Sequence, residues 1–356
     1  MEVNIGGRSV GTGHPALIIA EVSANHRGNL DVALRAIDAA AEAGADAVKF
    51  QHLRAEHIAA DVPAEFEWKG QKDFKTFSEF YKKSELPYEW TPKLALRAKE
   101  RDIMFLSTPF DKEAVDVLEP HVPAYKVASY EMSDDMLLGY IARKKKPVIL
   151  STGMAYLDEV KHALDVLRGG GSSEVIVLHC VSMYPPEPPD FNLHAIETIR
   201  RELNVPVGFS DHSLPGSNTA TLGAIALSAC VIERHITDSQ TGGSRDDENS
   251  MTPEQFTYMV KQVRELETML GTGIKTPVSR PEAGMDEMHE RRTRRSLYAA
   301  RDIPAGTPVT EDMVVTLRPV RGVEPKDFNL INGKKTKRDI KARAPITLND
   351  FFPAQK

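Results

Sequence analysis

The fold is decided by the stretch Leu17–Gln51, LIIAEVSANHRGNLDVALRAIDAAAEAGADAVKFQ, in which two short apolar runs flank a helical segment. The runs Leu17–Glu21 and Ala47–Gln51 have the length and aliphatic content of buried strands. Between them, Leu30–Ala43 repeats its apolar residues at the three-and-four spacing of an amphipathic helix. A strand, a helix and a second strand in this order are typical of parallel strands joined by right-handed crossovers.

The same pattern repeats as far as Leu270. Eight strand–helix units in roughly 255 residues fit a closed (β/α)8 TIM barrel better than an open doubly wound sheet. The predicted strands are Leu17–Glu21, Ala47–Gln51, Ile103–Thr108, Ala124–Ser129, Val148–Thr152, Val175–Cys180, Val205–Ser210 and Val231–His235. The amphipathic segments between them include Leu30–Ala43, Leu94–Arg101, Ala114–Leu118, Leu157–Leu167 and Leu193–Leu203.

The rest of the chain divides into three further parts. Val3–Gly13 contains a Gly6-Gly7 turn and is predicted to form a hairpin that caps one end of the barrel, so the barrel domain is expected over residues 1–275. Residues 276–292 are polar and lack periodicity, which is typical of a linker. Residues 293–356 are predicted to form a small, mostly β domain with so little apolar content that it leans on another surface.

One connection within the barrel is unusually long. His52–Trp90 contains Trp68, Phe74, Phe77, Phe80 and Tyr81, and a connection of this size is usually a lid or an ordered excursion.

Composition excludes several classes of protein. Apolar residues make up 41% of the chain and charged residues 27%, which excludes wholesale disorder. The net charge of −6 argues against a nucleic-acid partner, and no apolar run approaches a membrane span. Met1–Pro15 lacks the blocks of a signal peptide, so a cytoplasmic protein is expected. Cys180 and Cys230 are expected to be small buried hydrophobes.

Polar residues gather where the predicted strands end, which is where a barrel places its chemistry. A single strand-end serine, lysine or histidine is unremarkable, because such residues commonly cap helices or pack. Eight strands with polar ends on one rim indicate a site. The strand-end residues are Glu21, Lys49, Gln51, Thr108, Lys126, Ser129, Glu131, Ser151, Ser182, Tyr184, Ser210, His212, Glu233 and His235.

Two pairs within this set indicate particular chemistry. Lys49 and Lys126 lie in apolar strands, where burial is costly unless anions meet them, so they predict a pocket for phosphate and carboxylate. His212 and His235 end neighbouring strands and together can hold one divalent metal with open positions. The sequence lacks GxGxxG after the first strand and lacks GxxxxGKS, so it gives no support for a dinucleotide or P-loop site.

These residues resemble a known family. The motifs AEVSANHRGN, VKFQ, STPFD, YKVASYE, STGM, YPPE, FSDHS and ERHIT resemble those of the sialic acid synthases, and RRSLYAARDIPAGTPVTEDMV resembles the start of their antifreeze-like SAF domain. The resemblance implies a TIM barrel followed by a β-clip SAF domain. It also implies condensation of phosphoenolpyruvate with an N-acetyl amino sugar, which gives a nine-carbon 2-ulosonic acid and phosphate.

The resemblance assigns roles by matching positions. It implies a catalytic Glu21, a Mn²⁺ or Mg²⁺ ion on His212 and His235, and a domain-swapped homodimer in which Arg318 of the partner subunit reaches the sugar. The implied phosphoenolpyruvate ligands are Lys49, Thr108, Lys126, Ser129, Ser151, Ser182 and Ser210. The implied sugar ligands within the same chain are Gln51, Glu131, Tyr184 and Asp246.

Departures from the family pattern cluster at the expected sugar end. Tyr130 stands where glycine is common, Ser182 where asparagine is common, and Ser244-Arg245 where Gly-Pro is common. The acceptor is therefore N-acetylmannosamine or a 6-deoxy diacetamido hexose. Two alternatives stay open: another phosphoenolpyruvate-condensing barrel that makes a 3-deoxy-ulosonate, and a non-catalytic sugar-binding protein.

Overall fold

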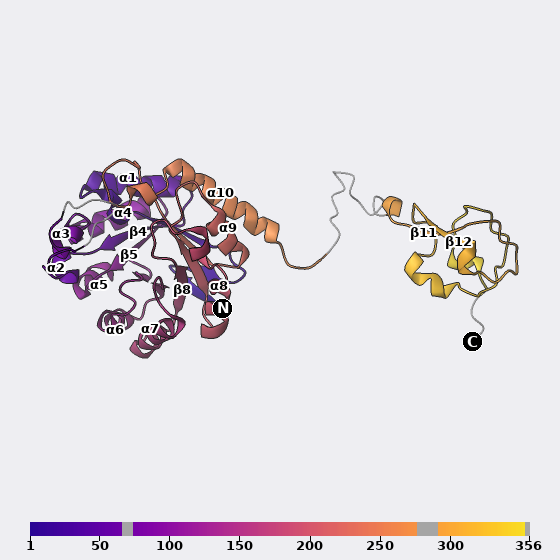
Figure 1. Cartoon of the computed structure of the whole chain (residues 1–356), viewed down its shortest axis with the longest axis horizontal. Helices are drawn as coiled ribbons and strands as arrows, with labels where there is room; N and C mark the ends of the chain where they lie inside the picture. The colour runs from indigo at the N-terminus through magenta and orange to yellow at the C-terminus, as the bar shows by residue number, and fades with distance from the viewer. Residues whose placement is uncertain (66–73, 276–290, 353–356) are drawn as a thin grey trace. The chain divides into compact units, whose positions relative to one another are not determined.

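Eight parallel strands form a nearly closed barrel surrounded by helices (Figure 1). The structure is a computed structural model that describes residues 1–65, 74–275 and 291–352. The ladder order is β5-β4-β3-β10-β9-β8-β7-β6, and β5 and β6 lie side by side where the barrel closes. The strands are β3 (Leu17–Glu21), β4 (Ala47–His52), β5 (Met104–Pro109), β6 (Tyr125–Val127), β7 (Val148–Ser151), β8 (Val175–Cys180), β9 (Val207–Asp211) and β10 (Val231–His235). The barrel prediction is confirmed.

Helices follow most strands as the sequence pattern predicts. The principal helices around the barrel are α1 (Leu30–Glu42), α4 (Thr91–Glu100), α5 (Lys112–Leu118), α6 (Asp135–Ala142), α7 (Leu157–Gly170), α8 (Ala195–Leu203), α9 (Thr219–Ala226) and α10 (Pro253–Leu270). Helices α6 and α9 lack a clear amphipathic period because most of their residues are apolar, so periodicity alone does not find them. In the described part of the chain, no helix is long and apolar enough to cross a membrane.

Alternation along the strands separates two layers of core. Outward-facing residues such as Ile18, Val48 and Phe209 pack in the cluster that includes the helices, whereas Leu17, Ala47 and other inward-facing residues form a second cluster. The inward-facing positions continue toward the carboxyl end of each strand. They therefore deliver the polar strand-end residues into the barrel mouth.

A hairpin closes the other end of the barrel. Strands β1 (Glu2–Ile5) and β2 (Arg8–Gly11) pair antiparallel, with Val3 opposite Val10. The side chains of Val3, Ile5 and Val10 are buried in the inward-facing cluster with residues of the barrel strands. Gly6 and Gly7 take positive φ angles of 60° and 92° at the turn.

The long connection after β4 contains short helices. They are α2 (Ala55–Ile58), α3 (Phe77–Lys82) and η2 (Tyr88–Trp90). Phe80 packs edge-on against Phe74 and Tyr81, with ring centroids 4.9 Å and 5.1 Å apart. The predicted aromatic residue Trp68 lies outside the described residues.

The chain separates into two compact units, Met1–Thr272 and Gly273–Lys356. The second unit contains β11 (Ser296–Ala299) and β12 (Val314–Leu317), which pair antiparallel. It has a buried cluster of its own, so the expectation that its thin apolar content leaves it little core is wrong. The buried members are Leu297, Ala299, Ile303, Val309, Val323, Ile331, Ile340, Ile346 and Phe351. Most of the predicted linker, 276–290, lies outside the described residues.

Candidate active site

A pocket opens at the carboxyl ends of the barrel strands. Thirteen of the residues proposed from sequence line it, together with the aromatic side chains of Phe80, Tyr81 and Tyr130. These thirteen residues come from seven strands or the loops that follow them. They are Glu21, Lys49, Gln51, Lys126, Ser129, Glu131, Ser151, Ser182, Tyr184, Ser210, His212, His235 and Asp246.

One proposed residue of the barrel, Thr108, does not line the pocket. Thr108 is fully buried near the end of β5, and its hydroxyl oxygen has no partner among the described residues. The structure therefore does not place Thr108 among the residues that face a ligand. Arg318 follows β12 in the second unit, where its Nε donates to the carbonyl oxygen of Thr293.

Two lysines and two glutamates form an ionic network at the base of the pocket. Lys49 Nζ lies 2.9 Å from Glu233 Oε1 and 3.2 Å from Glu21 Oε2. Lys126 Nζ donates to Ser151 Oγ at 2.7 Å and lies 3.8 Å from Glu233 Oε1. All four charged side chains are at least 95% buried. Glu233 thus supplies much of the negative charge that the buried lysines need, a role that the site predictions missed.

The members of this network have pKa values that are shifted in different directions. Burial raises the pKa of Glu21 to about 7, with Lys49 opposing the rise. Burial alone would also raise the pKa of Glu233, but Lys126 and Lys49 outweigh it and lower that pKa. Burial lowers the pKa of Lys126 to about 8. Glu21 therefore exchanges a proton near neutrality, which is the range that suits a general acid or base.

The two proposed metal-binding histidines lie next to each other at the ends of β9 and β10 and both line the pocket. Their ring centroids are 5.5 Å apart, with an interplanar angle of 62°. His212 Nδ1 lies 2.8 Å from the carbonyl oxygen of Val181, which fixes Nδ1 as the protonated nitrogen and leaves Nε2 as the lone-pair donor. Tyr184 stacks on His212 at 4.1 Å and holds the ring in place.

These imidazoles fit a divalent cation. His235 Nδ1 is buried without a hydrogen-bond partner among the described residues, and His212 has the backbone carbonyl partner typical of a ligating histidine. In the described parts of the chain, no group of three or more His, Cys, Asp or Glu side chains is arranged to hold a metal. The two imidazoles therefore suit an ion with open coordination positions rather than a structural zinc.

A glycine makes room for the hydroxyls of two loops. A Cβ atom added to Gly153 would lie 2.1 Å from Ser182 Oγ and 3.0 Å from Ser129 Oγ. Ser129 Oγ accepts a hydrogen bond from the Gly153 amide at 2.9 Å. The glycine of the STGM motif is therefore needed for the close approach of both serines.

The outer part of the pocket is polar and aromatic. Gln51 Nε2 donates to Glu21 Oε1 at 2.7 Å, which links the outer part of the pocket to the ionic network. Burial raises the pKa of Glu131 to about 7. Arg245, to which no role was assigned from the sequence, stacks over Phe80 at 4.1 Å. Glu233, predicted at the strand end but without a role, shares the inward-facing register of His235. That two-residue register was the sequence signal for Glu233.

The chain thus combines a parallel-strand barrel, whose strand ends carry two buried lysines and an imidazole pair, with a small β unit. The chain belongs to the NeuB family, whose model matches residues 36–275, and residues 294–351 match the SAF domain. It is an enzyme of the sialic acid synthase type. The resemblance stated from the sequence is thus confirmed.

Characterised relatives span nearly the whole chain. The chain is 36% identical to the pseudaminic acid synthase of Campylobacter jejuni over 96% of its own length and 98% of the relative. It is 36% identical to the N,N'-diacetyllegionaminic acid synthase of Legionella pneumophila, over 93% of each. The crystal structure of the spore coat polysaccharide biosynthesis protein SpsE of Bacillus subtilis matches with a TM-score of 0.68 and 33% identity over 100% of both chains.

Proposed function

We propose that this enzyme condenses phosphoenolpyruvate with an N-acetyl amino sugar to give a nine-carbon 2-ulosonic acid and inorganic phosphate. The observation that carries the proposal is the ionic network of Lys49 and Lys126 beside the imidazoles of His212 and His235 in one pocket. The names of the relatives, which are synthases of pseudaminic and legionaminic acids, support the same reaction class.

The lysines and hydroxyls hold the phosphoenolpyruvate. Lys49 and Lys126 supply two ammonium groups for its phosphate and carboxylate, and Ser129, Ser151 and Ser210 supply hydroxyl donors. Ser182 is the remaining donor of this group. Because the charged groups are buried and already positioned, they stabilise the negative charge that moves onto the phosphate as the reaction proceeds.

Glu21 moves the proton of the attacking water. The enol carbon C3 of phosphoenolpyruvate forms a bond to the aldehyde carbon, whose oxygen takes up a proton and becomes a hydroxyl, and water adds to C2. The carboxylate of Glu21 accepts one proton of that water. The C2–O bond to phosphate then breaks, and the remaining proton of the C2 hydroxyl leaves with the phosphate, so that a C2 carbonyl is formed. The Glu21 pKa of about 7 suits this role as a general base, and Gln51 holds the Glu21 carboxyl group in place.

His212 and His235 would hold the Mn²⁺ or Mg²⁺ ion through their free imidazole nitrogens. When bound, such an ion supplies Lewis-acid polarisation of a carbonyl oxygen. Tyr184 keeps the His212 ring oriented by stacking, so the ligand nitrogen stays directed into the pocket.

The acceptor lies at the outer part of the pocket, against Glu131, Tyr184 and Asp246. Phe80, Tyr81 and Tyr130 make this end apolar on one side, which favours an acceptor with a 6-methyl group over one with a 6-hydroxyl. We therefore rank a 6-deoxy diacetamido hexose above N-acetylmannosamine. Arg318 of the partner subunit completes this end in a domain-swapped homodimer.

Phosphate release tests the reaction. The full chain is incubated with phosphoenolpyruvate, with and without Mn²⁺, and with a panel of N-acetyl and diacetamido hexoses, and products are identified by mass spectrometry. Release that requires both metal and sugar is expected, and phosphoenolpyruvate labelled with ¹⁸O at the bridging oxygen should give labelled phosphate. The proposal fails if release is independent of the sugar. Label retained in the sugar product would exclude C–O cleavage.

A further inference from the structure

A single loop brings Arg245 and Asp246 to the pocket. Residues 236–252 run from β10 to α10 across the barrel mouth, and both side chains line the pocket from this loop. The loop has little regular structure, namely the three-residue turn Asp247–Asn249. Backbone hydrogen bonds such as that from the Thr237 amide to the Met251 carbonyl oxygen hold its two ends, and its conformation between them depends on side-chain contacts.

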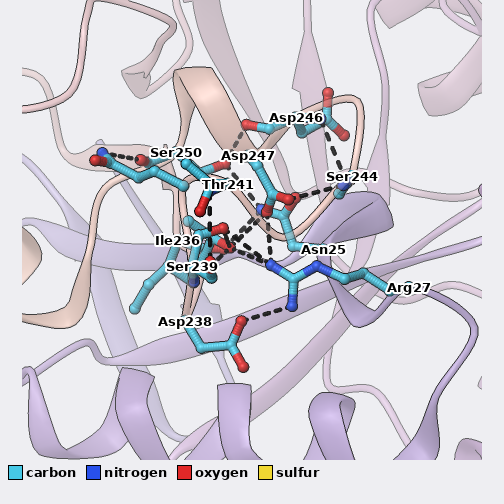
Figure 2. A network of polar contacts seen from close by, with 12 residues as sticks. Asn25, Arg27, Ile236, Asp238, Ser239, Thr241, Ser244, Asp246, Asp247 and Ser250 are labelled. Carbon is cyan, nitrogen blue, oxygen red and sulfur yellow. Dashed lines mark hydrogen bonds and ion pairs between the residues drawn. The ribbon is translucent and has the colours of Figure 1, made fainter.

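Arg27, which does not line the pocket, holds this loop through several hydrogen bonds. The residue follows β3, and its guanidinium donates to Asp238 Oδ1 at 2.7 Å, Asp247 Oδ1 at 2.8 Å and Thr237 Oγ1 at 3.0 Å (Figure 2). It also donates to the carbonyl oxygen of Ser239 at 3.0 Å. One planar cation thus binds four acceptors of one loop, a multidentate arrangement that a lysine cannot reproduce.

Asp247 ties the two ends of the loop together. Its carboxylate is 98% buried and accepts from Thr237 Oγ1 at 2.6 Å as well as from Arg27. The second oxygen, Oδ2, accepts from the Ser244 amide at 2.7 Å. Because the carboxylate is buried, removing the arginine leaves a buried charge without its principal counterion.

Two residues close to Arg27 in the sequence, Ser23 and Asn25, form further hydrogen bonds with the loop. Ser23 Oγ donates to Asp246 Oδ2 at 2.6 Å. Asn25 Nδ2 donates to the carbonyl oxygen of Ile236 and to Ser250 Oγ, both at 2.8 Å (Figure 2). Residues 23, 25 and 27 thus contact the start, middle and end of the loop. The hydrogen bond from Ser23 fixes the Asp246 carboxylate, which faces the pocket.

We infer that Arg27 and Asp247 are positioning residues for the acceptor end of the site. Neither lies among the described residues that line the pocket, yet they set the loop that presents Arg245 and Asp246. Arg245 in turn stacks over Phe80 at 4.1 Å and Phe74 at 5.0 Å, so the loop also holds the aromatic wall. The inference rests on the proposed function only in naming that end of the pocket as the acceptor subsite.

We call the contacts of Arg27 with residues 237, 238, 239 and 247 the brace. The chain offers a second way to break the brace and a matched control variant. Arg35 on α1 also contacts Asp238, at 3.5 Å, but its side chain is 59% exposed. Arg35→Met is therefore the control, because it removes a positive charge beside the same carboxylate without removing a buried contact. Gly242→Ala tests the brace without a charge change, because a Cβ at this position would lie 2.3 Å from the guanidinium of Arg27.

Hydrogen exchange on the full chain tests the brace directly. Arg27→Met and Gly242→Ala should speed amide exchange in residues 237–250, whereas Arg35→Met should not. Asp247→Asn should add little to Arg27→Met, because both remove the same ion pair. Exchange of residues 237–250 that stays at the wild-type rate in both brace variants would overturn the inference.

Steady-state kinetics separate positioning from general destabilisation. Arg27→Met should raise the KM for the amino sugar on the order of tenfold or more while leaving the KM for phosphoenolpyruvate within about twofold. Arg27→Lys should recover part of the loss. Equal changes in both KM values would overturn the positioning role. If the wild-type enzyme itself turns over no amino sugar, the proposed function fails, and the exchange experiment still decides the brace.

Discussion

Glu233 Oε1 lies 2.9 Å from Lys49 Nζ, and the same oxygen is 3.8 Å from Lys126 Nζ and 3.3 Å from Ser210 Oγ. One carboxylate oxygen is thus shared between two ammonium groups and a hydroxyl in the deepest part of the pocket. This sharing keeps two lysines charged in a buried place until a more anionic ligand arrives.

Glu233→Gln should therefore weaken phosphoenolpyruvate binding and destabilise the fold together. Without the carboxylate, Lys126 keeps a proton less readily, since burial already lowers its pKa to about 8. We expect the KM for phosphoenolpyruvate to rise on the order of tenfold and the free energy of unfolding to fall by about 3 kcal/mol. Phosphate-release kinetics and urea denaturation measure the two effects. An unchanged KM would show that Glu233 does not support the anion site.

His212→Ala and His235→Ala should each abolish Mn²⁺-dependent phosphate release. Both rings face the pocket, and neither belongs to the apolar core, so the melting temperature should change little. A Mn²⁺ titration followed by electron paramagnetic resonance measures the lost affinity directly. His194→Ala, at an exposed position before α8, is the matched control. Full Mn²⁺-dependent turnover in either pocket variant would refute the ligand assignment.

Glu21→Gln should lower kcat by about 10² to 10⁴ with little change in phosphoenolpyruvate affinity. Burial raises the pKa of Glu21 to about 7, so the fraction present as carboxylate increases from pH 6 to pH 8. If the carboxylate is the base, the wild-type rate rises over this range and the residual rate of the variant does not. A wild-type rate in Glu21→Gln would remove Glu21 from the chemistry.

Acid should destabilise the barrel through His52. This side chain is fully buried between Ser107 Oγ and Thr91 Oγ1, each at 2.7 Å, and burial lowers its pKa to about 3. The unfolded chain takes up a proton near pH 6.5, whereas the folded chain does not. The free energy of unfolding is therefore greatest above pH 6.5 and falls as the pH drops toward 3. Between pH 7 and pH 5, His52 alone accounts for a loss of about 2 kcal/mol.

Urea denaturation at several pH values checks this prediction. His52→Asn should be less stable at pH 7 but should lose less additional stability on acidification than the wild type. His194→Asn, whose imidazole is exposed, should keep the wild-type dependence. A His52→Asn protein with the full pH dependence would contradict the assignment.

Arg318→Ala should impair sugar use through the neighbouring subunit of the proposed dimer. Arg321→Ala, three residues away in the same segment, is the control. Mixing Arg318→Ala with Glu21→Gln protomers should restore activity up to about a quarter of the wild-type value, because half of the dimers then contain one intact site. No recovery on mixing, in protein shown to exchange subunits, would exclude a shared site.

Much of the barrel was predictable because strand parity and strand ends obey simple rules. Strands β3, β8 and β10 begin and end at the predicted residues, and helix α1 differs by one residue. Strand β6 is shorter than predicted, since residue 124 at its start and residues 128 and 129 at its end lie outside the ladder. The position of Glu21, Lys49, Lys126, His212 and His235 at or near the strand ends then predicted that they share one pocket, which they line.

Other features depend on contacts that no local pattern reports. Thr108 has the inward register but is covered completely, so a matching motif did not ensure access to the pocket. The grip of Arg27 on Asp247 joins residues 220 positions apart. Such pairs arise because β3 and β10, the first and last strands of the barrel in chain order, pair in parallel and bring the loops that follow them together.

The hairpin plug formed by Val3, Ile5 and Val10 gives the barrel a dead end. Every substrate and product of the proposed reaction must then pass through the pocket opening at the carboxyl ends of the strands. In the proposed reaction, the phosphoenolpyruvate that binds to the lysines then has to enter before the amino sugar occupies the outer part of the pocket. The phosphate can leave only after the sugar product has left. For the proposed reaction, we therefore expect phosphoenolpyruvate to bind before the amino sugar and phosphate to leave after the sugar product.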